Sequence, residues 1–565
     1  MNLAFLAILF LTALALGYHF YGRIVEKRYA LDEELPTPAV LYEDGRDYTP
    51  TKPFYLMGQH FSAIAAAGPI AGPIIACQLF GWAPCLLWIL LGAIFIGAVH
   101  DYSSLIASVR HRARSIAEIV RQRIGVRAWW SMMLFIWIAL IYVILAFAEI
   151  TASTFVGKTE ELQELGVFFN PGGAVAAAST VYLTLAILMG LVQRKWNPSL
   201  LLQTIMFVPA SLGCVWLGTK ISTLFLLSQT TWSLLILAYC FVASLLPLWL
   251  LLQPRGYLGG FILYIALAVG VIGLLFGDFS IRQPSFVTWN AGGMTGALFP
   301  FMFVTIACGA CSGFHGLVAS GTTSKQIAKE SHCRPVGYGS MLLEGFVALI
   351  ALSTVMIAAP EVLKGVSPGR IYGDGMGRFL TVLLGEQHFI FAATFGAMAF
   401  STFVFDTLDV ATRLGRYILQ ELFGLEGRRG AVIATAITIL PPAGLLLIST
   451  EGAYRLFWTL FGTSNQLLAS LSLLLICLWL KQSGRSFWFA LIPMLFVMTM
   501  TIWSLLIQIR WAFGSVFRSG FTLDVTFMNG LICLLLLLLA GMMITEATFK
   551  SVRQTFQAAP TSTAD

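Results

Sequence analysis

Apolar runs of roughly 20 residues, separated by short polar stretches, repeat along the whole chain. A helix of this length crosses the ~30 Å hydrocarbon core of a bilayer. Fifteen such runs can be counted, so the pattern predicts an all-α polytopic membrane protein. Their approximate bounds are residues 2–20, 58–78, 82–107, 128–155, 174–192, 199–219, 231–252, 257–277, 297–315, 337–359, 389–411, 431–449, 455–480, 486–509 and 526–547.

Composition and charge placement agree with this class. The 565 residues are 58% hydrophobic and 11% charged, against about 25% charged in a soluble domain. With the N-terminus outside and the C-terminus inside, 25 of the 34 Lys and Arg residues fall on the inner side. This is the positive-inside rule, so the net charge of +7 indicates a bilayer partner and no nucleic acid. Met1 to Tyr18 lacks a basic leading region, so we interpret it as an uncleaved anchor.

Two of the apolar runs are interrupted by small residues. Residues 58–73 read GQHFSAIAAAGPIAGP, and residues 303–315 read FVTIACGACSGFH. A break at bilayer depth frees backbone groups that lipid cannot satisfy, so it is tolerated only beside protein or a cavity. A pair of interrupted spans in corresponding halves of an array is the best sequence pointer to a transporter's binding site.

The two interruptions also define a repeat. A group of five spans starts with each interrupted span. The two groups are offset by seven spans, an odd number, so equivalent helices cross the membrane in opposite directions, as an inverted repeat requires. A chance offset in a long array is the alternative. The predicted units are residues 1–57 (anchor and cytoplasmic loop), 58–230 (first five-helix repeat), 231–296 (two-helix insertion), 297–480 (second repeat) and 481–565 (two C-terminal helices and tail).

Small residues at the interruptions are the candidate substrate site. Proline removes a backbone donor, glycine lowers the cost of unwinding, and a half-helix N-terminus attracts a carboxylate. Released carbonyls can hold a cation. A Pro-kinked packing helix is the alternative interpretation. The predicted substrate-binding residues are Gly68, Pro69, Gly72, Pro73, Gly309, Ser312, Gly313 and Phe314.

Titratable side chains inside the spans are candidates for ion coupling, because intramembrane charges are costly. Either His60 or His315 can relay a proton, although an internally hydrogen-bonded histidine is the alternative. Glu149 has small polar neighbours (Thr151, Ser153 and Thr154), which we expect it to face. Glu344 is a further intramembrane carboxylate, and His100-Asp101 reads either as a salt-bridged gate or as an ordinary helix end.

Asp406 and Asp409 share a helix face. Arg413 follows Asp409 at i+4, which predicts a structural ion pair. Asp406 has no such partner on its helix, so it is the better candidate for coupling.

Two further patterns concern cations. Ser401-Thr402 would lie on the eighth helix of a ten-helix core, where hydroxyls facing the first interruption could bind sodium; hydroxyl bonding within the helix is the alternative. Cys308, Cys311 and His315 have spacing compatible with metal ligation, but no fourth ligand is evident, so we predict no metal.

Five longer motifs are similar to those of a known protein family. They are residues 46–51 (RDYTPT), 97–102 (GAVHDY), 308–325 (CGACSGFHGLVASGTTSK), 337–339 (GYG) and 407–413 (TLDVATR). In this order, together with residues 58–73, they resemble the carbon starvation protein A family of peptide and pyruvate transporters. Departures are Gln59-His60, where the family usually has two histidines, and Cys311 and Asp406, which the family usually lacks.

The resemblance implies a fold and a function. The family is grouped with the amino acid–polyamine–organocation (APC) superfamily, which implies a LeuT-like core with a 5+5 inverted repeat. It also implies cation-driven uptake of pyruvate or short peptides across the bacterial inner membrane.

We therefore expect a secondary active transporter that imports a small carboxylate-bearing nutrient. Pyruvate is favoured over peptides because the core offers few charged groups for two peptide ends. The coupling ion is H⁺ or Na⁺, and we expect no other cofactor. No nucleophile–base motif or P-loop indicates an enzyme or direct ATP drive. The alternative is a membrane nutrient sensor, although no output domain is recognisable.

Overall fold

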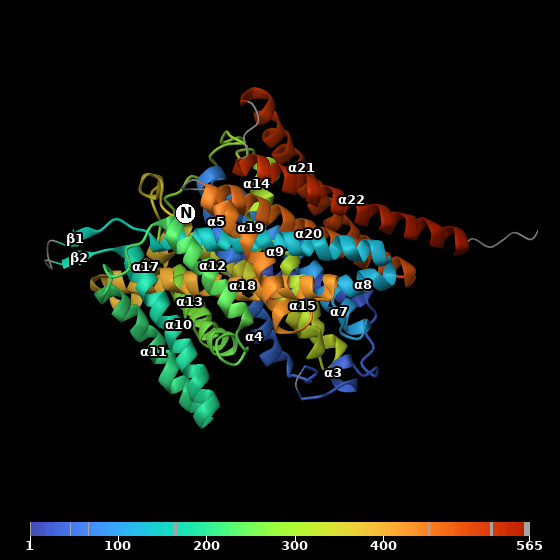
Figure 1. Ribbon diagram of the computed structural model, residues 1–565, viewed down its shortest axis with the longest axis horizontal. Coiled ribbons are helices and arrows are strands. Elements are labelled where there is room, and N and C mark those ends of the chain that lie inside the picture. The colour runs from blue at the N-terminus through green and yellow to red at the C-terminus, as the bar shows by residue number, and fades with distance from the viewer. Residues whose placement is uncertain are drawn as a thin grey trace, which may run out of the picture.

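Long helices make up most of the computed structural model, which describes residues 2–45, 47–65, 67–162, 167–449, 453–519 and 524–558. Arg46, from one of the motifs above, and Ala66, in the first interruption, lie outside the described residues. Figure 1 shows α9, α18 and α20 running along the long axis through the centre, and each of α18 and α20 packs against α9.

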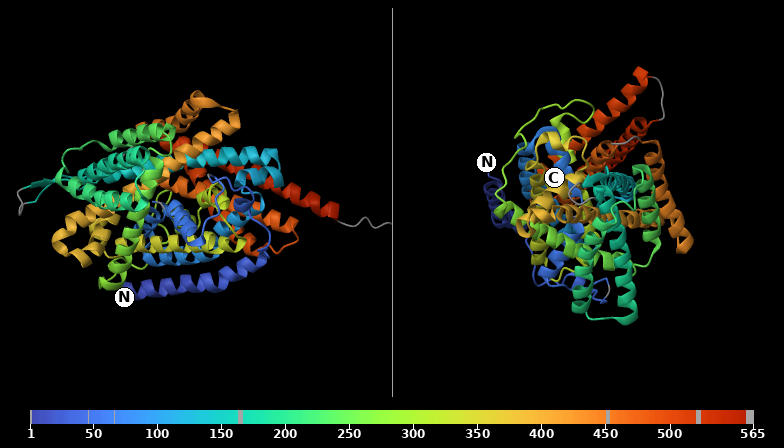
Figure 2. Two further views of the ribbon diagram at one scale, coloured as in Figure 1. Left: turned by 90° about the horizontal axis from the view of Figure 1, so that it is seen from below. Right: turned by 90° about the vertical axis from the view of Figure 1, so that its left-hand side faces the viewer.

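The N-terminal part of the chain contains the first interruption. A continuous span of α1 (Leu3–Leu16), the π-turn η1 (Gly17–Tyr21) and α2 (Gly22–Arg28) lies along one edge of the molecule (Figure 2). The elements that follow are α3 (Pro38–Leu41), α4 (Pro53–Ile64), α5 (Gly68–Phe80), α6 (Trp82–Gly92), the π-turn η2 (Ala93–Gly97), α7 (Ala98–Arg110), α8 (Ile116–Arg123) and α9 (Val126–Phe155).

The middle of the chain contains a short hairpin and four helices, of which α10 and α11 pack against each other. Strands β1 (Glu160–Leu162) and β2 (Val167–Phe169) pair antiparallel, with Glu160 opposite Phe169. They are followed by α10 (Pro171–Trp196), α11 (Leu200–Lys220), α12 (Gln229–Leu245) and α13 (Leu252–Phe276).

The C-terminal part contains the second interruption. Its elements are α14 (Leu298–Thr305), α15 (Gly313–Gly321), η3 (Thr323–Lys325), η4 (Glu330–His332), η5 (Arg334–Gly339), α16 (Ser340–Met356), η6 (Pro360–Leu363), α17 (Pro368–Leu384), η7 (Glu386–His388), α18 (Phe389–Phe423), α19 (Gly427–Ile448), α20 (Tyr454–Gln482), α21 (Trp488–Ser519) and α22 (Val525–Ala558).

Fewer helices than the predicted fifteen are long enough to cross a membrane. Among the described residues, twelve helices are long and apolar enough to cross a bilayer, and the bent pair α4–α5 makes a thirteenth. The other two predicted spans correspond to α12, which has 17 residues, and to the broken pair α14–α15. Neither forms a full-length helix, so the count of fifteen is not established.

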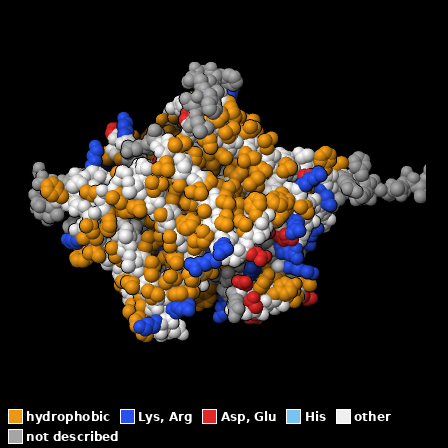
Figure 3. Space-filling view, viewed as in Figure 1, with side chains coloured by type: hydrophobic (Ala, Val, Ile, Leu, Met, Phe, Trp, Pro, Cys, Tyr) orange, Lys and Arg blue, Asp and Glu red, His pale blue; other side chains and the backbone are white. Residues whose placement is uncertain are grey.

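The burial of the spans separates a centre from a periphery. In the most apolar windows of α9 and α20, 89% and 94% of residues are buried, against 28% in α11. Figure 3 shows hydrophobic side chains over much of the visible face, with charged side chains mostly toward its right-hand and lower parts. The exposed apolar surface is that of a protein surrounded by lipid.

The first interruption lies before the Gly-Pro pairs and not within them. The chain leaves helical geometry around Ala65 and Ala67, and α5 starts at Gly68 with a bend of 48° from α4. Pro69 occupies the first turn of α5, where its missing N–H is not needed. Pro73 lies inside the helix. The motif therefore starts a helix, whereas the sequence predicted a break in the middle of one.

We expect Gly72→Ala to lower the melting temperature of the purified protein. A Cβ on Gly72 would lie 2.5 Å from the backbone oxygen of Thr305, so the two broken helices must separate. The cost of such overpacking is about 1–3 kcal/mol.

The matched control is Gly213→Ala in α11, where a Cβ meets no atom within 4 Å. Melting in detergent, followed by size-exclusion chromatography, compares the two variants. Equal melting temperatures would contradict the close crossing of α5 and α14.

Candidate functional site

The two interruptions cross each other in the centre of the protein. A Cβ on Gly68 would lie 2.4 Å from Cys308 Sγ, and one on Gly309 would lie 2.6 Å from Ala348 Cβ and 3.7 Å from Pro69. Real Cβ atoms do not approach other atoms as closely as 2.4 or 2.6 Å. Glycine at position 68 therefore leaves space for Cys308 of the second interruption, and glycine at position 309 leaves space for Ala348 of α16.

Side chains satisfy backbone carbonyls that the second interruption releases. Trp88 Nε1 and Gln466 Nε2 donate to Phe303 O at 3.2 and 3.0 Å, and Trp458 Nε1 donates to Thr305 O at 3.0 Å. A buried carbonyl with a protein partner is stable at membrane depth. These carbonyls of the second interruption are thus already hydrogen-bonded.

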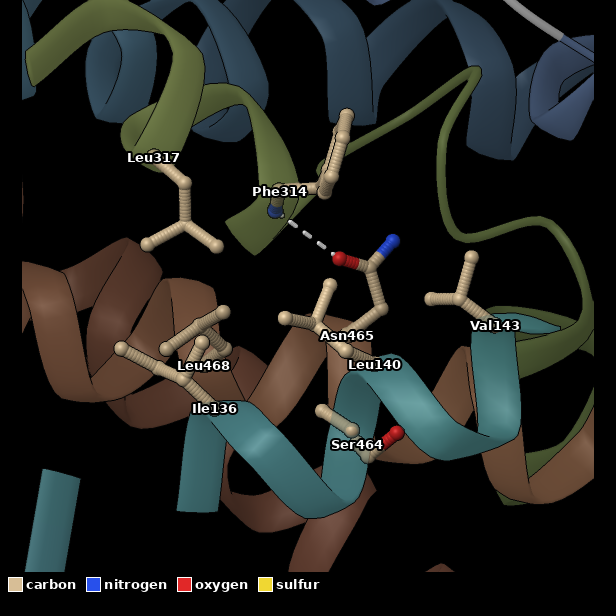
Figure 4. Close-up of a pocket in the computed structure, with 9 residues that line it drawn as sticks. Ile136, Leu140, Val143, Phe314, Leu317, Ser464, Asn465 and Leu468 are labelled. Atoms are coloured by element: carbon tan, nitrogen blue, oxygen red, sulfur yellow. Dashed lines mark hydrogen bonds between the residues drawn. The ribbon is translucent and has the colours of Figure 1, made fainter. Parts of the chain in front are cut away.

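A carboxamide from α20 caps the start of α15. Asn465 Oδ1 accepts from Phe314 N at 3.0 Å (Figure 4) and from Ser312 Oγ at 3.3 Å. Its Nδ2 donates to Ser312 Oγ at 3.0 Å and lies 3.4 Å from Cys308 Sγ. Asn465 is buried, and it takes the place of the side-chain cap that Ser312 itself does not make.

A small pocket lies beside this cap. Its volume is about 10 Å³, roughly the space of one water molecule. Figure 4 shows that polar atoms of Ser464, Asn465 and the Phe314 backbone meet apolar side chains there. The lining residues are Ile136, Ala139, Leu140, Val143, Phe314, Leu317, Ser464, Asn465 and Leu468.

In the first turn of the same half-helix, His315 lies between two carboxylates. Its Nδ1 is 2.8 Å from Asp101 Oδ2 on α7, and its Nε2 is 3.0 Å from Glu344 Oε2 on α16. The second oxygen of Asp101 is 2.7 Å from His100 Nδ1. All four side chains are at most 1% exposed. We call His100, Asp101, His315 and Glu344 the histidine–carboxylate cluster.

Local backbone geometry accompanies this cluster. Successive residues of a helix do not normally face each other, yet the side chains of His100 and Asp101 meet. The π-turn η2 ends at Gly97, just before them, and π-turns of this kind are frequent at functional sites. On the opposite side, the ring of His100 packs against Gly316 of α15.

His60 joins the two broken helices at the other end of α15. Its Nδ1 lies 2.9 Å from Thr323 Oγ1, and the ring is buried. It also interacts electrostatically with Asp101 and His315. The structure therefore brings the predicted residues His60 and His315 into one region.

Glu149 lies apart from the cluster. Its Oε1 accepts from Gln229 of α12 at 3.1 Å, and its Oε2 has no hydrogen-bond partner among the described residues. The expectation that it faces Thr151 and Thr154 is wrong. Both hydroxyls bond to carbonyls of their own helix, four residues back.

Ser401 makes hydrogen bonds away from the first interruption. Its Oγ lies 2.7 Å from Ser179 Oγ of α10 and donates to the carbonyl of Met398 at 2.9 Å. The methyl group of Thr402 faces Gly259 of α13, and its hydroxyl is buried without a hydrogen-bond partner among the described residues. The sodium site at these two hydroxyls stays a prediction.

Asp406 has a strong partner from a segment that the sequence placed in a loop. Arg255 lies in α13, fully buried, with Nη2 2.7 Å from Asp406 Oδ1 and Nη1 2.6 Å from Asp409 Oδ2. Tyr239 Oη donates to Asp409 and accepts from Arg255. The view of Asp406 as unpartnered, based only on its own helix, is therefore wrong.

The predicted Asp409–Arg413 pair does not form, because Arg413 bonds elsewhere. Its Nη2 donates to the carbonyls of Ala243 and Leu246 at 2.8 and 3.1 Å. Arg416 Nη1 donates to Ser244 O at 2.5 Å. These guanidinium groups cap the end of α12. We therefore interpret the charged residues of α18 (Asp406, Asp409, Arg413 and Arg416) as structural groups that hold α12 and α13 against α18.

The metal alternative gains no support from the geometry. Among the described residues, no three His, Cys, Asp or Glu side chains are arranged to hold a metal ion. Both ring nitrogens of His315 face carboxylates, and Cys308 contacts Asn465.

Sequence reasoning missed Asn465 and Arg255, and it named Glu344 and Asp101 without their partners. The cost of polar groups at membrane depth points to each of them. Asn465, for example, lies in a run of four polar residues (TSNQ) inside an apolar span. What the sequence could not supply was the pairing, because Asp101, His315 and Glu344 come from three helices.

Comparison with known families and proteins agrees with the resemblance in the sequence motifs. The family model described as carbon starvation protein CstA matches residues 2–374 and 359–504. The "Peptide transporter CstA" of Bacillus subtilis (strain 168) is 32% identical, over 97% of this chain and 97% of that protein. The "Pyruvate/proton symporter BtsT" of Escherichia coli (strain K12) is 29% identical, over 86% of this chain and 79% of that protein.

Solved structures match at lower similarity. MhsT in complex with L-phenylalanine is 14% identical with a TM-score of 0.44, over 87% of this chain and 99% of that chain. A manganese transporter of Eremococcus coleocola is 14% identical with a TM-score of 0.43, over 90% of this chain and 99% of that chain.

We expect Asp406→Asn to destabilise the fold and to reduce exchange and gradient-driven accumulation of substrate by the same factor. The Asp406 side chain is 30% exposed and Arg255 keeps its contact with Asp409, so we expect a cost below the roughly 3–5 kcal/mol of a fully buried pair. Melting and transport in proteoliposomes measure both effects. Asp374→Asn, in the partly exposed Arg370–Asp374 pair, is the control. Loss of accumulation with intact exchange and stability would instead assign ion coupling to Asp406.

Proposed function

Because this chain belongs to the carbon starvation protein CstA family, we propose that it is a proton-coupled importer of a small carboxylate-bearing solute. Pyruvate is the favoured substrate, and short peptides come next. The names of the relatives support both classes. The observation that carries the proposal is the buried contact of His315 with Asp101 and Glu344 beside the crossing of two broken helices.

The charge of the cluster supports cation coupling. Two carboxylates face His315, so even a fully protonated ring leaves one negative charge in a buried site. An uncompensated buried charge is expensive, and one added cation removes it. A proton is the favoured cation because imidazole changes charge near neutral pH.

Substrate and proton would act on the same nine-residue helix. The first turn of α15 contains Phe314, whose N–H meets Asn465, and His315, whose ring meets the carboxylates. A substrate carboxylate would take over the N–H of Phe314 and the hydroxyl of Ser312, where the helix dipole favours an anion. The pocket of about 10 Å³ is too small for pyruvate, so binding requires Asn465 and α15 to move.

Alternating access then follows from motion of α15. In the conformation described, His315 ties α15 to α7 and α16, and His60 ties the segment after α15 to α4. Neutralising the cluster weakens the attraction between His315 and its carboxylates, so the half-helix can rock away from α7. The small residues Gly68, Gly72 and Gly309 would form the walls of the path, and the 5+5 repeat would supply the two-fold relation between its ends.

Transport by purified protein in proteoliposomes tests the proposal. Uptake of labelled pyruvate is measured with an imposed proton gradient, with a sodium gradient and with neither. We expect accumulation above equilibrium only with the proton gradient. Accumulation only with the sodium gradient would show that the coupling ion is Na⁺ and not H⁺. Absence of uptake by folded protein would overturn the proposal for pyruvate and favour peptides or a sensor.

Glu344→Gln tests the role of the cluster. It removes one buried negative charge, so the cluster is neutral without an added proton when His315 is charged. We expect gradient-driven accumulation to be lost while counterflow exchange continues. The control is Glu361→Gln, at an exposed residue of η6. Proton-driven accumulation that matches wild type would place coupling outside the cluster.

The orientation is part of the same proposal. We expect the N-terminus outside and the C-terminus inside the bacterial cytoplasmic membrane, because 25 of 34 Lys and Arg residues then lie on the inner side. A reporter fused after the last residue, active only in the cytoplasm, measures this directly. Activity from a reporter that works only outside the cell would reverse the orientation.

A further inference from the structure

The two imidazoles of the cluster differ in what their second nitrogen faces. Both nitrogens of His315 lie at ion-pair distance from carboxylates, at 2.8 and 3.0 Å, although the Nε2 contact with Glu344 lacks hydrogen-bond geometry. In the neutral form, one of them would turn a lone pair toward a negative oxygen. The geometry therefore suits a permanently charged His315. His100 differs, since Nδ1 meets Asp101 at 2.7 Å and Nε2 is buried without a hydrogen-bond partner among the described residues.

Gly316 of α15, the helix that we propose to move, covers Nε2 of His100. A Cβ on Gly316 would lie 3.3 Å from His100 Nε2, 3.2 Å from its Cε1 and 3.4 Å from Ser104 Oγ. Ser104 Oγ is likewise buried without a partner in the described part of the chain. Two unsatisfied polar atoms on one face of α7 therefore face the backbone of α15. Displacement of α15 would open both to water.

We propose that His100 takes up and releases the transported proton, while His315 remains a charged bridge between Asp101 and Glu344. This inference rests on the proposed function and names the group that carries out its coupling step. With His315 charged and His100 neutral, the cluster has a net charge of −1. A proton on His100 makes it neutral.

The proton transfer balances without a further reactant. A hydronium ion gives its proton to His100 Nε2 and becomes water, and the ring keeps its Nδ1–H on Asp101 Oδ1. Release reverses this step on the other side of the membrane, after α15 has changed position. Proton access and substrate access are thus controlled by the same helix, since α15 covers His100 and contains Phe314.

The surroundings leave His100 in contact with few other titratable groups. Those in or near the cluster are Asp101 on its own helix, His315 on α15, Glu344 on α16, Cys308 and Cys311 in the second interruption, and His60 on α4. Charged groups toward the C-terminal end of α7 and on its neighbours pair with each other: Arg110 with Glu330, Arg334 with Glu26, and Arg114 with Glu118.

His100→Asn is the decisive variant, because its side-chain amide can donate to Asp101 but cannot take up a proton. We expect proton-driven accumulation of pyruvate to be lost and the pH dependence of exchange, between roughly pH 5 and 8, to flatten. Melting of the purified variant in detergent checks that the loss does not come from a failure to fold. Wild-type accumulation with an unchanged pH profile would overturn the assignment.

Gly316→Ala provides a second test that does not alter a titratable group. The added methyl group crowds the Nε2 edge of His100, so the pH profile of exchange should shift relative to wild type. The control is Gly321→Ala at the end of the same helix, where a Cβ meets no atom within 4 Å. Superimposable profiles for the two variants would count against proton access through this contact.

The wild-type protein separates failure of this inference from failure of the proposed function. If wild type shows no proton-driven uptake, the proposed function fails, and the His100 assignment fails with it. If wild type is coupled, Glu344→Gln is uncoupled and His100→Asn behaves as wild type, only the assignment of the proton to His100 is wrong.

Discussion

Backbone hydrogen bonding at the two interruptions is the constraint on which the rest of this structure depends. A helix that stops inside a membrane must find partners for its freed groups within the protein. Here Trp88, Trp458 and Gln466 supply donors to the end of α14, and Asn465 supplies an acceptor at the start of α15. These partners come from α6 and α20, so the breaks are stable only when those helices pack against them.

The same constraint explains the glycines. Side chains that reach backbone atoms require close helices, and close helices leave no space for a Cβ at Gly72 or Gly462. Satisfied carbonyls and small residues are thus two parts of one arrangement. It holds the centre together while leaving α15 short, with few residues of its own to resist movement.

Two buried charge clusters use similar residues for different purposes. Around Arg255, one guanidinium group meets two carboxylates, a tyrosine and a carbonyl, and these contacts join α12, α13 and α18 to one another. Such a dense set of bonds favours a fixed joint. Around His315, imidazoles replace the guanidinium group, and the contacts fall on the half-helix next to the interruption. Imidazole can change its charge near neutral pH, whereas guanidinium cannot.

The sequence by itself determined the class of protein, because hydrophobic length and charge placement are properties of consecutive residues. It also indicated both interruptions, since Gly68-Pro69 and Gly309–Gly313 are local signals, and its motifs pointed to the family. Only the tertiary structure decided which charges meet. Arg255 approaches Asp406 across 151 positions of the chain, and Asp101 approaches His315 across 214. An ion pair between helices depends on how the helices pack, and no spacing within one helix contains that information.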